Sequence, residues 1–100
     1  MTNVVIIAIG VATWFHPHRE TANGYHVCAS RTIPKGSLVR VTDIHNGSSV
    51  VVIVDDWGPA AWTKAEIDLS PKAFEHLNGL ELGKAKVKIE VLKQKPKKPH

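Results

Sequence analysis

The sequence predicts a single, mainly β-stranded domain that closes into a barrel and carries one short helix. Its 100 residues and hydrophobic content of 43% suit one globular core and leave no room for a second domain. Short runs of β-branched residues are separated by turn-forming residues, a pattern typical of closed or nearly closed barrels. Only residues 70–79 carry both a start and a stop signal for a helix.

The first strands are predicted from runs of apolar residues. The run at residues 4–9 is interpreted as a buried strand that continues for a few more residues. Residues 38–44 and 50–54 are rich in β-branched residues, with Asn46-Gly47 between them. Both of these residues tolerate the positive φ that a tight primed turn requires, so the two strands are expected to form an antiparallel hairpin.

The last strand is predicted at residues 84–92, where apolar and charged residues alternate strictly. One face is expected to be buried and the other exposed, because successive strand residues point to opposite sides. The buried face is expected to hold Ala85, Val87, Ile89 and Val91, and the exposed face Lys84, Lys86, Lys88 and Glu90.

The helix is expected to begin after Ser70, whose hydroxyl can cap it, with Pro71 in its first position. Asn78-Gly79 is expected to end it. Residues 17–24, which are polar and turn-forming, are expected to form a loop. The helix face that packs on the sheet is expected to hold Ala73, Phe74 and Leu77.

The net charge of +4 comes from the C-terminal end of the chain. Without the four lysines among the last eight residues, nine Lys and Arg face nine Asp and Glu, so the folded part is formally neutral. We therefore interpret residues 1–92 as the barrel domain and residues 93–100 as a solvated, basic tail. The distribution does not favour a nucleic-acid partner. The four lysines are Lys93, Lys95, Lys97 and Lys98.

The sequence also limits the cellular context. The apolar run at residues 4–9 is far shorter than the roughly 20 residues that a membrane helix needs. No Lys or Arg precedes Arg19, so an export signal is not expected within this chain. If the protein acts outside the cytoplasm, either this chain is part of a longer protein that carries the export signal, or another route delivers it. The lone Cys28 excludes an internal disulfide.

Seven segments, taken in order, resemble the rare lipoprotein A (RlpA) family. The resemblance runs in register over about residues 10–92, and the order of the segments carries it rather than any one of them. The segments are Gly10-Val11-Ala12-Thr13-Trp14-Phe15, Thr21-Ala22-Asn23-Gly24, Arg31-Thr32-Ile33-Pro34-Lys35-Gly36-Ser37, Val39-Arg40-Val41-Thr42, Asn46-Gly47, Asp56-Trp57-Gly58-Pro59 and Ile67-Asp68-Leu69-Ser70.

The resemblance implies a six-stranded double-psi β-barrel and a lytic transglycosylase that cleaves peptidoglycan glycan strands in the cell envelope. The acidic residue of the family's Asp-Arg-Gly-Pro motif falls on Asp56, and the motif arginine is Trp57. Active members usually carry Glu after Asn-Gly, where this chain has Tyr25. They carry His before the Thr-Leu-Pro-like segment, where this chain has Ser30.

The chemistry that the resemblance implies needs one carboxyl group. A lytic transglycosylase uses the sugar's own 6-hydroxyl as the nucleophile, so one group can act first as acid and then as base. A hydrolase normally needs two carboxyl groups. We expect Asp56 rather than Asp55 to be this group, since the two point to opposite sides of a strand. The indole of Trp57 is a candidate for an apolar wall that raises the pKa of Asp56.

Further residues are candidates for supporting roles. Glu20 and His26 are candidate auxiliary groups that replace the family's missing Glu and His. Asp68 is expected to be structural and to hold backbone amides near the helix start. Trp14 is expected to pack in the core. The candidate substrate-binding residues are Asn23, Tyr25, Trp57, Gly58 and Trp62, several of them flat rings on which a sugar can stack.

Alternatives remain open at this point. His16, His18, His26 and Cys28 form two alternating pairs that would suit zinc, although we expect neither a metal nor a cofactor. The departures at Tyr25 and Ser30 suit a non-catalytic wall-binding module like the expansins, or a structural domain of a phage tail or lysis apparatus. The chain is expected to be a monomer unless it belongs to such an assembly.

Overall fold

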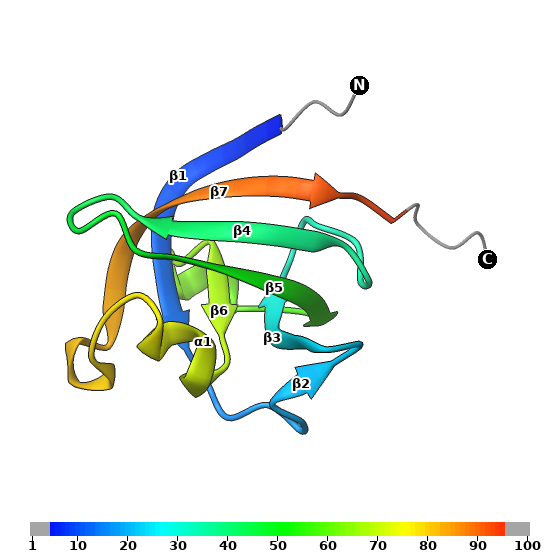
Figure 1. Cartoon of the computed structure of the whole chain (residues 1–100), viewed down its shortest axis with the longest axis horizontal. Coiled ribbons are helices and arrows are strands. Elements are labelled where there is room, and N and C mark those ends of the chain that lie inside the picture. The colour runs from blue at the N-terminus through cyan, green and yellow to red at the C-terminus, as the bar shows by residue number, and fades with distance from the viewer. Residues whose placement is uncertain (1–4, 96–100) are drawn as a thin grey trace.

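The computed structural model describes residues 5–95 and confirms the predicted barrel (Figure 1). Six strands form the wall in the order β3-β5-β4-β7-β1-β6, and the pairing of β3 with β6 closes the ring. The two-residue β2 is added alongside β3. The strands are β1 (Val5–Trp14), β2 (Thr21–Ala22), β3 (Tyr25–Ser30), β4 (Leu38–Asp43), β5 (Ser49–Asp56), β6 (Ile67–Leu69) and β7 (Lys84–Lys93).

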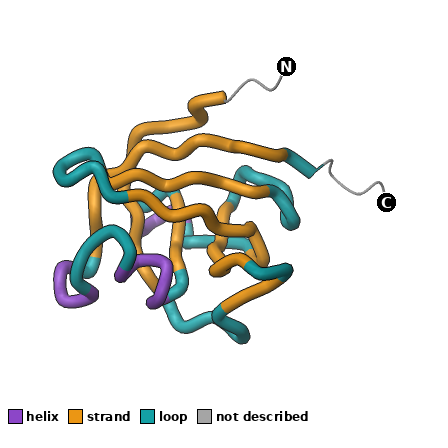
Figure 2. The backbone as a smooth tube through the Cα atoms, in the orientation of Figure 1, coloured by secondary structure: helices purple, strands orange, loops and turns teal. Residues whose placement is uncertain are grey.

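One α-helix and two short 3-10 turns complete the fold over the residues that the structure describes. They are η1 (Ala61–Thr63), α1 (Pro71–Glu75) and η2 (Leu80–Leu82), and α1 and η2 lie side by side outside the strand wall (Figure 2). None of the helices among residues 5–95 is long and apolar enough to cross a membrane.

The direction of the strands decides where the loops meet. β1–β6 and β3–β5 are the parallel pairs of the ring, and the other neighbours are antiparallel. Parallel neighbours cannot be joined by a hairpin. Because β3 and β5 run in the same direction, the segments that follow them, residues 31–37 and 57–66, leave the barrel at the same end.

The alternation predicted for the last strand is confirmed on its inner face, where all four apolar residues are buried. The outer face differs from the prediction at Glu90, which is only 7% exposed. The Arg40 guanidinium lies against its carboxylate, with two N–O distances of 3.2 Å, and Lys88 Nζ lies 3.6 Å away. These cations cover the carboxylate and compensate its burial.

The first strand is present, but its prediction as a buried run is wrong at Ile9, which is 58% exposed. β1 pairs with β7 from Val5 onward and gains β6 as a second neighbour only from Ala12. Before that point one edge of the strand is open. Ile9 lies opposite Lys88 on the outer face, while Ala12 is fully buried. Val4 lies outside the described residues.

The β4–β5 hairpin is confirmed, but its turn is not the predicted two-residue primed turn. Asp43 N donates to Ser48 O over 2.8 Å, so four residues form the loop, and only Gly47 has a positive φ, +79°. The carboxylate of Asp43 accepts from the N–H groups of His45 and Asn46. This buried carboxylate fixes the loop as a wider turn.

The primed turn occurs instead between β2 and β3, within the predicted loop. Asn23 and Gly24 have φ values of +50° and +85°, and the flanking Ala22 and Tyr25 are paired. Two central residues with positive φ define a type I′ turn. The predicted loop over residues 17–24 is therefore wrong at Thr21–Ala22, which form β2, a strand too short to be seen in the sequence.

The helix starts as predicted and ends earlier. Ser70 Oγ accepts from Ala73 N over 3.2 Å, and Pro71 is the first helical residue. The last helical residue is Glu75, three residues before Asn78. Asn46 Nδ2 donates to Leu77 O over 2.9 Å, so the β4–β5 loop satisfies a carbonyl that a longer helix would use. The predicted packing face of the helix is buried.

The C-terminal strand extends one residue past its expected end, to Lys93. Lys95 N then donates to Ser37 Oγ over 3.0 Å, so the start of the expected tail lies against the barrel. Residues 96–100, which make up the rest of that tail, lie outside the described residues. The boundary at residue 92 stays a prediction.

Cys28 provides a test of barrel closure. Its side chain is fully buried, and burial, with the charges of Asp55 and Asp68, raises the pKa of the thiol. A protonated, inaccessible thiol is unreactive. We expect Ellman's reagent to leave the native chain unlabelled at pH 8 and to release one equivalent after guanidinium unfolding. Rapid labelling of the native chain would contradict the closed barrel.

Candidate functional site

The main candidate site is a cavity of about 260 Å³ at the end of the barrel where β3 and β5 finish. Its walls come from the loop after β3 and from the end of β5, which the parallel pairing brings together. Asp56 is the only carboxylate that lines it among residues 5–95. The lining residues are Ser30, Arg31, Thr32, Ile33, Pro34, Lys35, Asp56 and Trp57.

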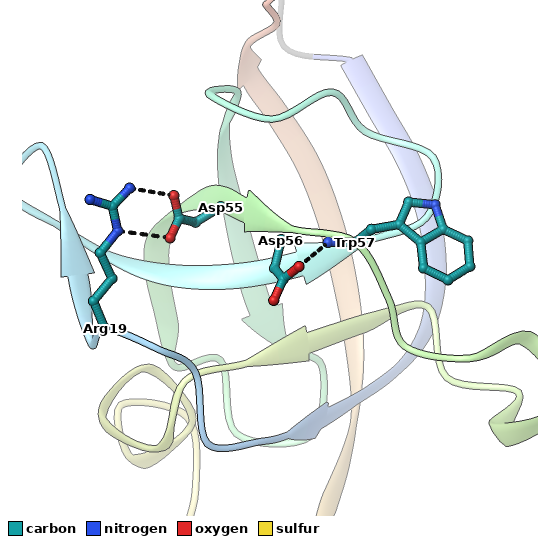
Figure 3. A network of polar contacts seen from close by, with 4 residues as sticks. All are labelled: Arg19, Asp55, Asp56 and Trp57. Atoms are coloured by element: carbon teal, nitrogen blue, oxygen red, sulfur yellow. Dashed lines mark hydrogen bonds and ion pairs between the residues drawn. The ribbon is translucent and has the colours of Figure 1, made fainter.

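Asp55 and Asp56 have different surroundings, as predicted from strand alternation (Figure 3). Asp55 forms a bidentate ion pair with Arg19, at 2.6 and 2.9 Å. The hydrogen bond from Arg19 lowers the pKa of Asp55. Asp56 Oδ1 accepts from Trp57 N over 2.8 Å, and its carboxylate is turned away from Arg19 (Figure 3). Asp56 is thus the acid that faces the cavity.

The indole of Trp57 does not form the apolar wall that was expected beside Asp56. Trp57 is 66% exposed, and its ring points away from the Asp56 carboxylate (Figure 3). The backbone N–H of Trp57, rather than its ring, contacts the acid. Trp62, on η1, is 83% exposed. Both indoles are therefore available as stacking surfaces on the segment after β5.

Arg31 holds that segment in place, a role that the sequence did not reveal. Its Nη1 donates to Pro59 O and, over 3.0 Å, to Ala65 O. These two carbonyls lie near the two ends of the segment that carries Trp62. The guanidinium can bridge them because the loops after β3 and β5 leave the same end of the barrel, which only the strand pairing determines.

Ser30 shapes the opposite wall. It is buried, and its Oγ accepts from Thr32 N over 3.2 Å and from Ile33 N over 3.0 Å. A hydroxyl that accepts such bonds fixes a tight turn. At the position where the resemblance led us to look for a histidine, the residue thus organises the backbone of the cavity wall.

Gly58 is buried against Ala29, 3.8 Å from the position that a Cβ would take. Its φ of +145° suits glycine and few other residues. Gly58 precedes Pro59 through a cis peptide bond. Its backbone conformation accounts for the glycine, and its substrate-binding role stays a prediction.

His26 lines a second cavity, of about 290 Å³, and Glu20 contacts His26 rather than Asp56. Glu20 Oε2 lies 3.0 Å from His26 Nδ1, and Glu20 Oε1 accepts from Lys72 N over 3.2 Å. His26 pairs with Val52, whereas Asp56 pairs with Ala29, so roughly 10 Å of strand separates the two levels. Neither Glu20 nor His26 lines the cavity of Asp56, so neither is placed to assist it there. The second cavity is lined by His26, Lys72, Glu75 and His76.

Asn23 and Tyr25 lie at the same distant end of β3. Both are exposed, and neither lines the cavity of Asp56. The conformation of the type I′ turn explains Asn23. Among the residues predicted for the site, the structure therefore brings Asp56 and Trp57 together and leaves Asn23 and Tyr25 apart from them.

Asp68 does not hold the amides at the helix start. Its Oδ1 accepts from Thr13 Oγ1 over 2.8 Å, while Ser70 and Glu20 bind the amides of Ala73 and Lys72. Thr13 and Asp68 are paired residues of β1 and β6, which places the carboxylate against a strand. Burial raises the pKa of Asp68.

Residues 5–95 contain no cluster of three or more His, Cys, Asp or Glu side chains that could hold a metal ion. Cys28 belongs to the core, His26 contacts Glu20, and His16 packs edge-on against Trp14. Trp14 itself is partly buried against the core and donates to Leu80 O over 3.0 Å, as its predicted packing role requires.

A family model described as lytic transglycolase matches residues 7–89. The chain belongs to this family. The family resemblance predicted from the seven segments is thereby confirmed, and the molecule is an RlpA-like double-psi β-barrel.

The RlpA-like barrel is 42% identical over 92 residues to endolytic peptidoglycan transglycosylase RlpA of Pseudomonas aeruginosa (strain UCBPP-PA14), covering 82% of this chain and 26% of that protein. The protein of the same name from Helicobacter pylori (strain J99) is 33% identical over 92 residues, covering 83% and 29%. That of Campylobacter jejuni is 33% identical over 94 residues, covering 85% and 34%. The chain thus spans between a quarter and about a third of these relatives.

Asp68 gives a pH-dependent test of this RlpA-like barrel. Because its pKa is raised in the fold, the native state holds the proton more tightly than the unfolded state. The contribution of Asp68 to the free energy of unfolding therefore falls as pH rises above its unfolded-state pKa, near 4, and is lost above its folded-state pKa. We expect Asp68→Asn, which can still accept from Thr13, to stabilise the barrel at pH 7 by less than about 1 kcal/mol.

Urea unfolding at pH 7 and pH 3 measures this effect, and the gain should vanish at pH 3, where both side chains are neutral. Asp55→Asn is the matched control. The pKa of Asp55 is lowered, so its removal should destabilise the barrel at pH 7, and this loss of stability should shrink as pH falls through the lowered folded value. A less stable Asp68→Asn variant at pH 7 would show that the fold uses the Asp68 charge.

Proposed function

We propose that the chain is the barrel domain of a peptidoglycan lytic transglycosylase of the cell envelope, with Asp56 as its single acid and base. The observation that carries the proposal is the position of Asp56 as the one carboxylate of its cavity among residues 5–95, in a barrel of the lytic transglycolase family. The names of the relatives supply the substrate class.

The reaction needs one group that gives and then takes a proton. The protonated carboxyl of Asp56 donates to the glycosidic oxygen as the bond from that oxygen to the anomeric carbon breaks. The resulting carboxylate removes the proton from the 6-hydroxyl of the same sugar, whose oxygen bonds to the anomeric carbon. The products are a 1,6-anhydro sugar and a new chain end with a free hydroxyl, so no water is consumed.

A one-carboxylate mechanism agrees with the geometry better than hydrolysis does. A hydrolase needs a second carboxyl group roughly 5 to 10 Å from the first, across the scissile bond. Asp55 is bound to Arg19, and Glu20 is bound to His26 and to the Lys72 amide. Asp68 pairs with Ala29 from the other side, but its Oδ1 accepts from Thr13 Oγ1. None of these three acids lines the cavity of Asp56.

The exposed indoles suit a glycan strand laid across this end of the barrel. Trp57 lines the cavity, and Trp62 extends from the segment that Arg31 bridges. Sugar rings present C–H faces that stack on such rings. Cleavage at Asp56 and contact with two indoles would then involve neighbouring sugars of one strand.

We expect Asp56→Asn to lower the release of 1,6-anhydro products from peptide-stripped sacculi by at least about 100-fold, the usual contribution of an acid–base group. Asp55→Asn is the matched control, because it removes a neighbouring carboxylate outside the cavity, and it should retain activity. Mass spectrometry of the soluble products measures both. Products with ordinary reducing ends, or full activity in Asp56→Asn, would contradict the proposed role of Asp56.

A second candidate function is a non-catalytic wall-binding module. The observation that favours it is the replacement of the expected Glu and His by Tyr25, at the far end of β3, and Ser30, a backbone-organising residue. Such a module would keep the exposed indoles and the cavity, and it would lack a second acid–base group beside Asp56.

Sacculus pull-down distinguishes binding from cleavage. We expect Trp57→Ala to weaken retention by roughly two- to tenfold, since an exposed aromatic contact is lost. The control Leu82→Ala removes another exposed apolar side chain, on η2, and should bind normally. Normal retention of Trp57→Ala would contradict a role for this indole. Retention of Asp56→Asn, with no product from the unaltered chain, would favour the binding module over the enzyme.

A further inference from the structure

The outer face of β4, β7 and β1 carries a row of lysines that the function proposed above does not use. Cross-strand partners in an antiparallel pair share a face, so the register defines what lies there. Lys84 is opposite Thr13, Lys86 opposite Val11, and Lys88 lies between Ile9 and Thr42. We call this surface the lysine face and define it by Arg40, Thr42 and Ile44 of β4 and the following loop, Lys84, Lys86, Lys88 and Glu90 of β7, and Ile9, Val11 and Thr13 of β1.

The lysine face has an excess of positive charge, although the barrel as a whole is nearly neutral. Glu90, the one acid among these residues, is buried and paired with both Arg40 and Lys88. Asp68 of β6 lies at the edge of the face, where it accepts from Thr13 Oγ1. Lys84 and Lys86 are exposed and take part in no ion pair among residues 5–95. Strand geometry spaces these lysines about 7 Å apart along β7. The chain therefore gathers uncompensated cations on one side of the barrel.

Two exposed isoleucines flank the lysine row. Ile9 of β1 is 58% exposed and lies opposite Lys88. Ile44 follows the last residue of β4, is 43% exposed, and its N–H donates to Lys86 O over 3.1 Å. Exposed apolar side chains beside cations lose water-accessible area when the face meets a partner that is anionic at its surface and apolar beneath.

The lysine face is centred on β7, on the opposite side of the barrel from β3, which precedes one loop of the candidate site. In the ring of six strands, β7 is three strands from β3 in either direction. The cavity lined by Asp56 lies at the end of β3 and β5. A partner that covers the lysine face therefore leaves that cavity open, and the two surfaces can be occupied together.

We propose that the lysine face docks the barrel on an anionic phospholipid surface. Lys84, Lys86 and Lys88 contact the headgroup phosphates, and Ile9 and Ile44 enter the region between headgroups and acyl chains. A hydrated, soluble polyanion would match the lysines alone and would leave both isoleucines in water. The combination of charge and exposed apolar side chains selects the lipid surface, because lysines near such a surface contribute additively.

Co-sedimentation of the chain with phosphatidylglycerol vesicles, compared with phosphatidylcholine vesicles, tests the proposal. We expect binding to the anionic vesicles alone. Lys84→Gln/Lys86→Gln should weaken it by roughly fivefold for each lysine, or about 25-fold in all. The control Lys64→Gln/Lys72→Gln removes the same charge from surfaces away from β7 and keeps the basic C-terminal residues, so it should bind normally. Circular dichroism verifies that both variants are folded.

The isoleucines provide a second, independent measurement. Ile9→Thr/Ile44→Thr keeps the β-branched shape and all charges, and should weaken vesicle binding by at least about tenfold. Equal losses in the two lysine variants would show a mere net-charge effect and overturn the proposal. So would normal binding of the isoleucine variant, or equally tight binding of a soluble polyphosphate, since either result identifies a charged polymer rather than a lipid surface.

Discussion

The pairing of β3 with β6 is the constraint on which the rest of the molecule depends. Three residue pairs, from Cys28–Leu69 to Ser30–Ile67, turn an open sheet into a ring. Closure leaves the ring without an open edge between β3 and β6 and buries Cys28 on the inside. It also sets Ala29 between two acids, because this residue pairs with Asp56 on β5 and with Asp68 on β6. The placement of Asp56 and Asp68 on either side of β3 is thus a consequence of ring closure.

Features that depend on neighbours in sequence could be predicted from the sequence alone. The alternation over β7 gives its buried face, and Ser70-Pro71 gives the start of the helix, because each is a local pattern with one physical cause. The order of motifs added the closed six-stranded ring, which local patterns do not specify. The prediction that Asp55 and Asp56 have different surroundings rested on alternation as well. The register shift beside Asp56 is a feature that alternation does not predict.

What could not be predicted depends on partners that are distant in the chain. The sequence pattern predicts that Glu90 is exposed, but in the fold Arg40, 50 positions away, lies against it. The sequence predicts that Asp68 binds amides at the helix start, but β1 brings Thr13 to it and Thr13 is its partner. The sequence predicts that Glu20 assists Asp56, but Glu20 contacts His26, which the parallel register of β3 and β5 places three residues along β3 from the partner of Asp56. In each case the side chain's partner is determined by strand pairing, which residue type and spacing do not encode.

The two consecutive acids show how such a site is built at small cost to the fold. Asp55 is paired with Arg19, so its charge is compensated on the outer side of β5, and its pKa is lowered by that partner. Asp56, one residue later, faces the cavity with a backbone N–H as its hydrogen-bond partner. The register of β3 and β5 shifts by one residue at this point, so that Cys28 pairs with Val54 and Ala29 with Asp56. Asp55 is the extra residue of β5, and the parallel β3 brings a second loop to Asp56. The strand pairing thus holds the acid at the mouth of the barrel.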